Sequence, residues 1–290
     1  MNDVDTLPWL ARTLAVKPVS GFFESEGARL HYLSWNAVEA HKPLLIFVHG
    51  YRAHAHWWDF IAPYFLEHHR VFALDLSGMG DSAHRSFYDA RVFASDIAGL
   101  IKHLMSGPAT VVAHSFGGGR VLRACADEPE LFSHLIVVDS YVQFYSEPIM
   151  DPPVPRPDSR ATPTRDALLE RFRLSPPQAT ALPALTKYIA KHSIRPVEGG
   201  WDWKFDRRLP TKVTEPEGQK VTALIQQPVD VIYGEFSNIV EPSRAQRTVA
   251  ELPNGHGPIC IPEGHHHIML TQPLALISAL LALLTIRRRP

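Results

Sequence analysis

The sequence has 290 residues, 45% of them hydrophobic, and its 29 Lys and Arg residues nearly balance 30 Asp and Glu residues. A chain of this length forms one large domain with an insertion, or two ordinary domains. The formal net charge of -1 creates no positive field that would attract nucleic acid, so we expect no nucleic-acid partner.

Cysteine usage and the two chain ends bear on the cellular compartment. The two cysteines form no C-x-x-C pair, so we expect neither a disulfide framework nor a structural zinc site. Asp3 and Asp5 stand where a secretory signal would be basic, and residues 1–18 contain no long apolar core. The apolar run at 274–286 is shorter than the roughly 20 residues that span a bilayer. These features predict a cytoplasmic protein without a membrane span.

Hydrophobic patterns predict strands that alternate with helices along most of the chain. A hairpin around Gly27 comes first, and short apolar runs then indicate strands that are buried on both faces. Helical patterns between these runs are typical of strand-helix-strand units in a parallel sheet. The predicted strands are 22–24, 28–35, 43–48, 71–74, 110–112, 134–138, 229–233 and 258–261, and the predicted helices are 57–65, 91–105, 120–126, 167–172, 179–189, 243–252 and the segment from 271 onward.

The composition changes between Pro148 and Pro216, where 12 of the 25 prolines lie and no strand-like apolar run occurs. We interpret residues 141–216 as an inserted helical lid, and residues 1–140 and 217–290 as the core. The predicted fold class is α/β, with a mostly parallel eight-stranded sheet and helices on both of its faces. In such sheets, ligands bind at the C-terminal ends of the strands.

Ser115 lies where a predicted strand gives way to a helix, within Ala113-His114-Ser115-Phe116-Gly117. In a G-x-S-x-G nucleophile elbow, the corner is so sharp that only small residues fit beside the serine, whose hydroxyl projects above the sheet. Ala113 replaces the first glycine and adds one methyl group. The structural alternative is an ordinary glycine-rich turn between a strand and a helix.

Four landmarks at predicted strand ends give the chain a resemblance to the α/β-hydrolase superfamily over nearly its whole length. These landmarks are His49-Gly50, residues 75–82, residues 113–117 and residues 262–267, and segments 54–59 and 199–206 look like those of a lidded bacterial serine hydrolase subgroup. The resemblance implies that Ser115 is the nucleophile of a triad. It implies no cofactor and no metal ion.

A serine hydroxyl needs an adjacent base, and three consecutive histidines stand in the loop where the superfamily carries that base. Superfamily members often have a proline seven residues after this histidine. Counting back from Pro273 selects His266, with His265 as the alternative and His267 behind it. A metal site built on the triplet is not expected, because neighbours in a chain rarely converge on one ion.

The acidic member of the triad departs from the commonest pattern. In the superfamily it usually follows the seventh strand, where this chain has Glu235 and then Ser237 and Asn238 in place of an aspartate. Some members carry the acid after the sixth strand, where Asp139 stands. The resemblance therefore favours Asp139, with Glu235 as the second candidate. The structural alternative for Asp139 is a cap on the following turn.

The resemblance also implies where the substrate binds. Backbone N–H groups of Tyr51 and Phe116 would stabilise the oxyanion that forms during acyl transfer. Four tryptophans either line an apolar acyl pocket or lie in the core, and these are Trp57, Trp58, Trp201 and Trp203.

Together these features predict a serine hydrolase that cleaves a small to medium, fairly apolar carboxylic ester through an acyl-enzyme. Its partner is a small-molecule ester substrate. Serine at the elbow argues against haloalkane dehalogenases and epoxide hydrolases, whose nucleophile there is aspartate. A lactone, thioester or C–C bond hydrolase with the same triad stays open. So does a degraded hydrolase fold that only binds, because the usual aspartate is missing.

Overall fold

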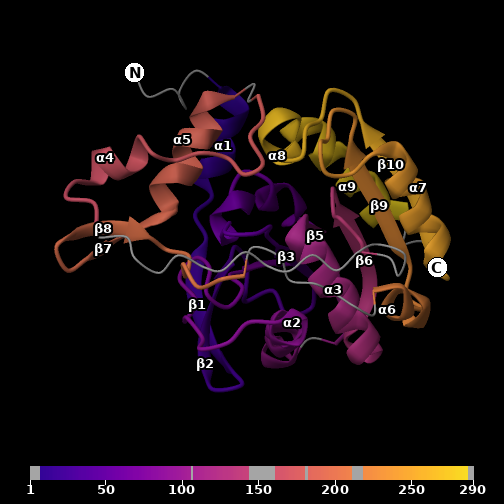
Figure 1. Cartoon of the computed structure of the whole chain (residues 1–290). Helices are drawn as coiled ribbons and strands as arrows, with labels where there is room; N and C mark the ends of the chain where they lie inside the picture. Colours follow the sequence, from indigo (N-terminus) through magenta and orange to yellow (C-terminus); the bar gives the residue numbers. More distant parts are fainter. Residues whose placement is uncertain (1–6, 106, 144–160, 180–181, 211–217, 287–290) are drawn as a thin grey trace.

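The computed structural model describes residues 7–105, 107–143, 161–179, 182–210 and 218–286. Its largest sheet consists of β1 (Val19–Ser25), β2 (Ala28–Ser34), β3 (Leu44–Val48), β4 (Arg70–Leu74), β5 (Ala109–His114), β6 (Phe132–Val138), β9 (Val229–Gly234) and β10 (Gly255–Ile261). The strand order is β1-β2-β4-β3-β5-β6-β9-β10 (Figure 1). β2 is antiparallel to both neighbours, and the other pairs are parallel. The predicted mostly parallel, eight-stranded sheet is confirmed.

Helices cover both faces of this sheet, as predicted. Successive side chains of a strand point to opposite faces, so that Ile46 of β3 belongs to one core and Phe47 to the other. The first core includes α2 (Ala90–Leu104), α3 (Phe116–Asp127) and α7 (Pro242–Glu251). The second includes α1 (Pro8–Ala15), the 3₁₀ helices η1 (Ala55–Trp58) and η2 (Ala62–Phe65), α5 (Pro183–His192), α8 (Ile268–Thr271) and α9 (Pro273–Ile286).

The inserted segment that was predicted at residues 141–216 contains, among its described residues, strands that the sequence did not predict. Besides α5 it holds α4 (Arg165–Leu169) and a hairpin of β7 (Ile194–Val197) and β8 (Gly200–Trp203), which lies across the molecule from α7 in Figure 1. Both hairpin strands mix polar and apolar residues and expose part of most side chains, so they lack a continuous apolar run. The predicted boundary at 216/217 lies outside the described residues, and the assignment of 141–216 as a lid stays a prediction.

Other element boundaries also differ from the prediction. The helix predicted at 57–65 is two short 3₁₀ helices, and Pro63, which has no N–H to donate, lies in the second. The described residues also form helices that were not predicted, namely α1, the 3₁₀ helix η3 (Pro129–Leu131), α6 (Gly218–Leu224) and α8. Among the described residues, no helix combines the length and apolarity needed to cross a bilayer.

Asp75, at the end of β4, joins three other segments of the core. Its carboxylate accepts hydrogen bonds from His31 Nδ1 at 2.7 Å, from the Ala55 N–H at 2.6 Å and from the Asp81 N–H at 2.8 Å. Burial alone would raise the pKa of Asp75. The hydrogen bonds from His31 Nδ1 and from the Asp81 N–H help to outweigh this effect, so that the pKa of Asp75 is held below its ordinary value.

Replacing Asp75 tests this junction. We expect Asp75→Asn to lower the free energy of unfolding by about 3 kcal/mol, because it removes a buried carboxylate that accepts hydrogen bonds from three groups. Since the folded state lowers the pKa of Asp75, the unfolded chain binds more protons in acid, and wild-type stability falls as the pH drops through about 4. Urea denaturation between pH 7 and pH 3 measures both effects.

The variant should lose less stability than the wild type over this pH range. Asp81→Asn is the control, because the Asp81 side chain is partly exposed and pairs with Lys204 instead. An equal acid-induced loss of stability in the Asp75 variant and the wild type would contradict the assignment.

Candidate active site

Ser115 occupies a strained corner between β5 and α3. Its backbone has φ 52° and ψ −118°, a region that residues other than glycine rarely adopt. The corner is crowded as well, because a Cβ atom on Gly117 would lie 2.7 Å from the carbonyl oxygen of His49. Ala113, which takes the place of the first glycine of the G-x-S-x-G motif, is fully buried. The sequence therefore places its serine on the sharp strand-to-helix turn that was predicted.

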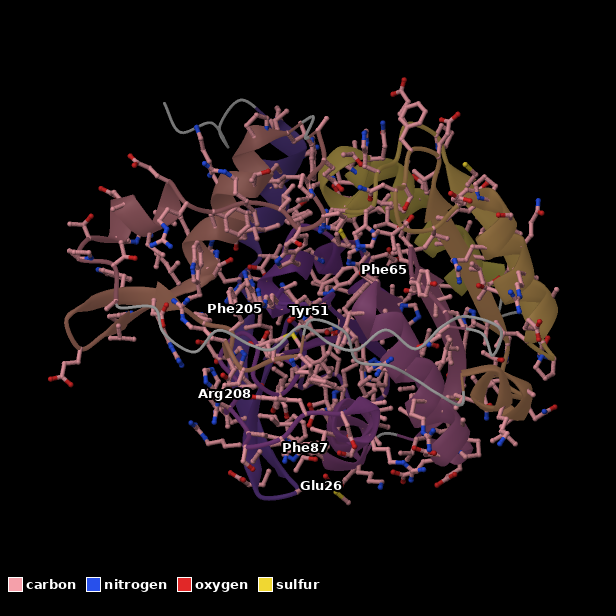
Figure 2. The ribbon with its side chains drawn as sticks, viewed as in Figure 1. Glu26, Tyr51, Phe65, Phe87, Phe205 and Arg208 are labelled. Carbon is pink, nitrogen blue, oxygen red and sulfur yellow. The ribbon has the colours of Figure 1, made fainter. Side chains whose placement is uncertain are left out.

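A cavity of about 800 Å³ opens beside Ser115, between the C-terminal edge of the sheet and the inserted segment. Its lining includes Tyr51 of the core and Phe205 of the inserted segment, both labelled in Figure 2. The Arg52 guanidinium carbon lies 5.1 Å from the centre of the Tyr51 ring and 4.6 Å from that of Phe205. Tyr51 also donates its hydroxyl hydrogen to the carbonyl oxygen of Leu209. The cavity is therefore shared between the two parts of the chain.

His266 reaches this cavity from the loop after β10, and Asp139 lies behind it. The two side chains form a hydrogen bond of 2.7 Å between His266 Nδ1 and Asp139 Oδ1. Asp139 is fully buried and also accepts from the Gly234 N–H at 2.8 Å and from Ser237 Oγ at 2.6 Å. A carboxylate can only accept here, so His266 Nδ1 carries the proton and Nε2 presents its lone pair.

The competing candidates have other partners. Glu235 accepts a hydrogen bond from the Glu263 N–H, and in the part of the chain that the structure describes no hydrogen bond joins it to His266. The ring of His265 packs edge-on against Phe236 and does not line the cavity. His267 does line it, but burial and the neighbouring His266 lower the pKa of His267 to about 3.

Ser115 and His266 line the same cavity without being hydrogen-bonded to each other. Among the described residues, no hydrogen-bond partner is found for Ser115 Oγ. Catalytic hydrogen bonds are often long in ligand-free sites and tighten when substrate binds. The arrangement is a serine, a histidine and a buried carboxylate brought from three different strand ends.

Two residues that line the cavity carry backbone N–H groups of interest. Phe116 is the first residue of α3, and Tyr51 follows β3, and neither N–H donates to another of the described groups. His49 fixes the loop before Tyr51, since it accepts from the Leu76 N–H at Nε2 and donates from Nδ1 to the Gly50 carbonyl oxygen. Burial lowers the pKa of His49, which keeps the ring in the neutral form that this pattern requires.

The tryptophans divide between the cavity and other environments. Trp57 and Trp203 line the cavity, whereas Trp58 is fully buried in the core and Trp201 is not among the lining residues.

The positive charge of the cavity lining was not predicted from the sequence. No described lining residue is acidic, and four are arginines, namely Arg52, Arg120, Arg171 and Arg173. Their positions in three separate segments gave no signal in the sequence.

Comparison with known proteins agrees with this architecture. A family model described as the alpha/beta hydrolase family matches residues 45–280. An esterase of Mycobacterium tuberculosis is 26% identical over 253 residues, which cover 84% of this chain and 84% of that protein. Other matches are shorter: a relative from Haemophilus influenzae is 34% identical over 97 residues, 33% of this chain and 34% of that protein.

Solved structures share the fold. The crystal structure of an esterase from Mycobacterium tuberculosis matches with a TM-score of 0.74 at 21% identity, over 98% of each chain. A thioesterase domain from the curacin biosynthetic pathway matches with a TM-score of 0.75 at 22% identity, over 91% of this chain and 99% of that domain.

Proposed function

The chain belongs to the alpha/beta hydrolase family, and we propose that it is a serine hydrolase that cleaves a carboxylic ester through an acyl-enzyme. The observation that carries this proposal is the pairing of Ser115, on its strained corner, with a histidine that a buried carboxylate orients in the same cavity. The esterase relative from Mycobacterium tuberculosis supports the choice of an ester bond.

In the proposed mechanism, His266 Nε2 takes the proton from Ser115 Oγ as that oxygen attacks the ester carbonyl carbon. The N–H groups of Tyr51 and Phe116 stabilise the resulting oxyanion. The C–O bond of the ester then breaks, and the leaving alcohol takes the proton from His266. Water attacks the acyl-enzyme with His266 again as base, which releases the acid and restores Ser115.

Asp139 keeps the His266 ring in the required tautomer and stabilises its charged form. Ser237 stands where an aspartate is commoner in the family, and it donates to the Asp139 carboxylate instead. We infer that the loop after β9 still supports the histidine, through Asp139 of the neighbouring strand. The alternative of a degraded hydrolase that only binds a ligand was based on the aspartate missing after the seventh strand. Asp139 as the acid weakens that argument.

The lining of the cavity refines the predicted substrate. Aromatic rings such as Trp57 and Phe172 suit the predicted apolar part of an ester. The arginines, with no acidic residue among the described lining residues, suit an additional carboxylate or phosphate group. We therefore propose an ester whose apolar acyl or alcohol part carries a negative charge. A thioester or C–C substrate with this charge is the alternative, because the same triad serves those bonds.

Removing the nucleophile tests the mechanism. We expect Ser115→Ala to reduce kcat on a p-nitrophenyl ester by about 10⁴-fold or more and to abolish the initial burst of p-nitrophenol. His266→Gln should act similarly, whereas the matched control His265→Gln should retain most activity. Stopped-flow kinetics and labelling with a fluorophosphonate probe provide the measurements. Unlabelled Ser115 in the folded wild-type protein would exclude a serine hydrolase and favour the binding protein.

A second pair of variants tests the acid. Asp139→Asn should lower kcat by roughly 10³- to 10⁴-fold, since the ring then loses its tautomer and the counter-charge. Glu235→Gln should leave kcat nearly unchanged. Ser237→Ala should reduce kcat by about 10-fold, because it removes one hydrogen bond to the carboxylate. A large loss in the Glu235 variant together with an active Asp139 variant would reverse the assignment.

Substrate charge is testable with matched esters. We expect kcat/KM for an ester of a dicarboxylic acid, with its second carboxylate free, to exceed that of its methyl ester by about 10-fold or more. The double variant Arg171→Gln and Arg173→Gln should remove most of this preference through KM. Arg165→Gln is the control, because Arg165 lies over Trp201 outside the lining. Equal kcat/KM values for the two esters in the wild type would contradict the charged-substrate proposal only.

A further inference from the structure

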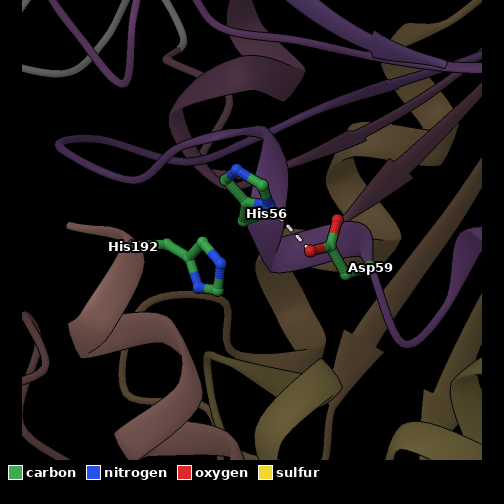
Figure 3. A group of neighbouring side chains, drawn as sticks. All are labelled: His56, Asp59 and His192. Carbon is green, nitrogen blue, oxygen red and sulfur yellow. Dashed lines mark hydrogen bonds and ion pairs between the residues drawn. The ribbon is translucent and has the colours of Figure 1, made fainter. Parts of the chain in front are cut away.

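Three side chains with metal-binding chemistry meet where the core contacts the inserted segment. His56 belongs to η1, Asp59 follows this helix, and His192 is the last residue of α5 (Figure 3). Each offers one potential ligand atom, and these atoms all lie within 4.8 Å of one another. None of the three residues lines the cavity beside Ser115.

Asp59 has one satisfied and one unsatisfied carboxylate oxygen. Oδ2 accepts hydrogen bonds from His56 Nδ1, at 2.7 Å, and from the Tyr188 hydroxyl. Oδ1 is buried and has no hydrogen-bond partner among the described residues. The whole residue is only 2% exposed. A buried, negatively charged oxygen without a donor is costly, and a bound cation would satisfy it.

His192 is held in the orientation of a ligand. Its Nδ1 lies 2.9 Å from the Tyr188 carbonyl oxygen, which can only accept, so Nδ1 carries the proton and Nε2 the lone pair. The His192 and His56 rings lie 4.1 Å apart between their centres. The side chain of His56 is 18% exposed, which leaves an approach from solvent.

We propose that His56, Asp59 and His192 form a binding site for a divalent transition metal ion of the Zn²⁺ type. Two imidazoles and one carboxylate match the ligand preference of such ions, whereas Mg²⁺ and Ca²⁺ prefer sites built from oxygen alone. On binding the ion, His56 would give up its hydrogen bond to Asp59 Oδ2. Small shifts would then bring one unprotonated nitrogen of each imidazole and a carboxylate oxygen to about 2.0–2.2 Å from the ion, with water as the fourth ligand. Tyr188 supports two of the ligands from outside, through its hydroxyl and its carbonyl oxygen.

In another group of three potential metal ligands, hydrogen bonds already occupy both carboxylate oxygens of the buried aspartate. This group consists of His31, Asp75 and Asp81. Both carboxylate oxygens of Asp75 accept from nearby N–H groups, and two of these donors are backbone groups that cannot give way to an ion. The site at His56 differs because its buried carboxylate keeps an open oxygen.

A bound ion would fasten the inserted segment to the core. The hydrogen bond of 2.9 Å between His54 Nε2 and Ser193 Oγ already joins the same two segments. Trp57 and Ser193, which are chain neighbours of His56 and His192, line the cavity. The ion would therefore restrain one wall of the cavity without contacting the proposed nucleophile, and the metal site is independent of the proposed hydrolase activity.

The test is titration of Zn²⁺ into the full-length protein after removal of metals with a chelator. Isothermal calorimetry should give one ion per chain, and Zn²⁺ should raise the Tm of the wild type. We expect His192→Gln and Asp59→Asn each to weaken binding by more than about 100-fold, and Tyr188→Phe by about 10-fold, as for residues that support metal ligands. Circular dichroism in chelator checks that each variant is folded.

Two controls separate this site from other histidines. His41→Gln, at an exposed position, should leave the affinity unchanged. His266→Gln should do the same, and loss of binding in this variant with retention in His192→Gln would move the ion to the catalytic histidines and overturn the proposal. X-ray absorption on the zinc-loaded wild type needs no variant and should show two imidazoles with oxygen ligands. Absence of saturable Zn²⁺ binding would also overturn it.

Discussion

The candidate site depends on the hydrogen bonds that the buried carboxylate of Asp139 accepts. This carboxylate receives hydrogen bonds from the last residue of β9, Gly234, from Ser237 in the loop after β9, and from His266 in the loop after β10. A carboxylate removed from water is tolerated only when such donors surround it. Three neighbouring strand ends are thereby fixed relative to one another, and the histidine cannot turn without leaving a buried charge short of a donor.

Strain at two adjacent strand ends accompanies this arrangement. Ser115 and Asp139 both have positive φ angles, at 52° and 45°, although neither is glycine. Each such residue costs on the order of 1–3 kcal/mol, and it persists only where its surroundings leave no alternative. Here the surroundings are β5 and β6, which pair in parallel and are buried almost throughout. The sheet therefore supplies the rigidity that keeps both side chains at its C-terminal edge.

The sequence predicted what depends on local pattern. Buried strands, the serine corner and the histidine loop each occupy a contiguous stretch, so their residue types reveal them. The hairpin at Ile194 to Trp203 was missed because half-buried strands with polar residues lack an apolar run. The choice between Asp139 and Glu235 depended on a resemblance, since only the fold shows that Glu235 turns to Glu263. No spacing rule relates His56 to His192.

The two parts of the chain contribute differently to the cavity. The core provides the serine, the histidine and the backbone N–H groups, and it fixes them through the sheet. The inserted segment provides Arg171 and Arg173. It is held to the core by the buried side chains of α5, such as Leu185, and by polar contacts such as that of Tyr188 with Asp59. Because these arginines and the proposed triad come from different parts of the chain, the proposed preference for a charged substrate can change through the inserted segment while the proposed chemistry stays with the core.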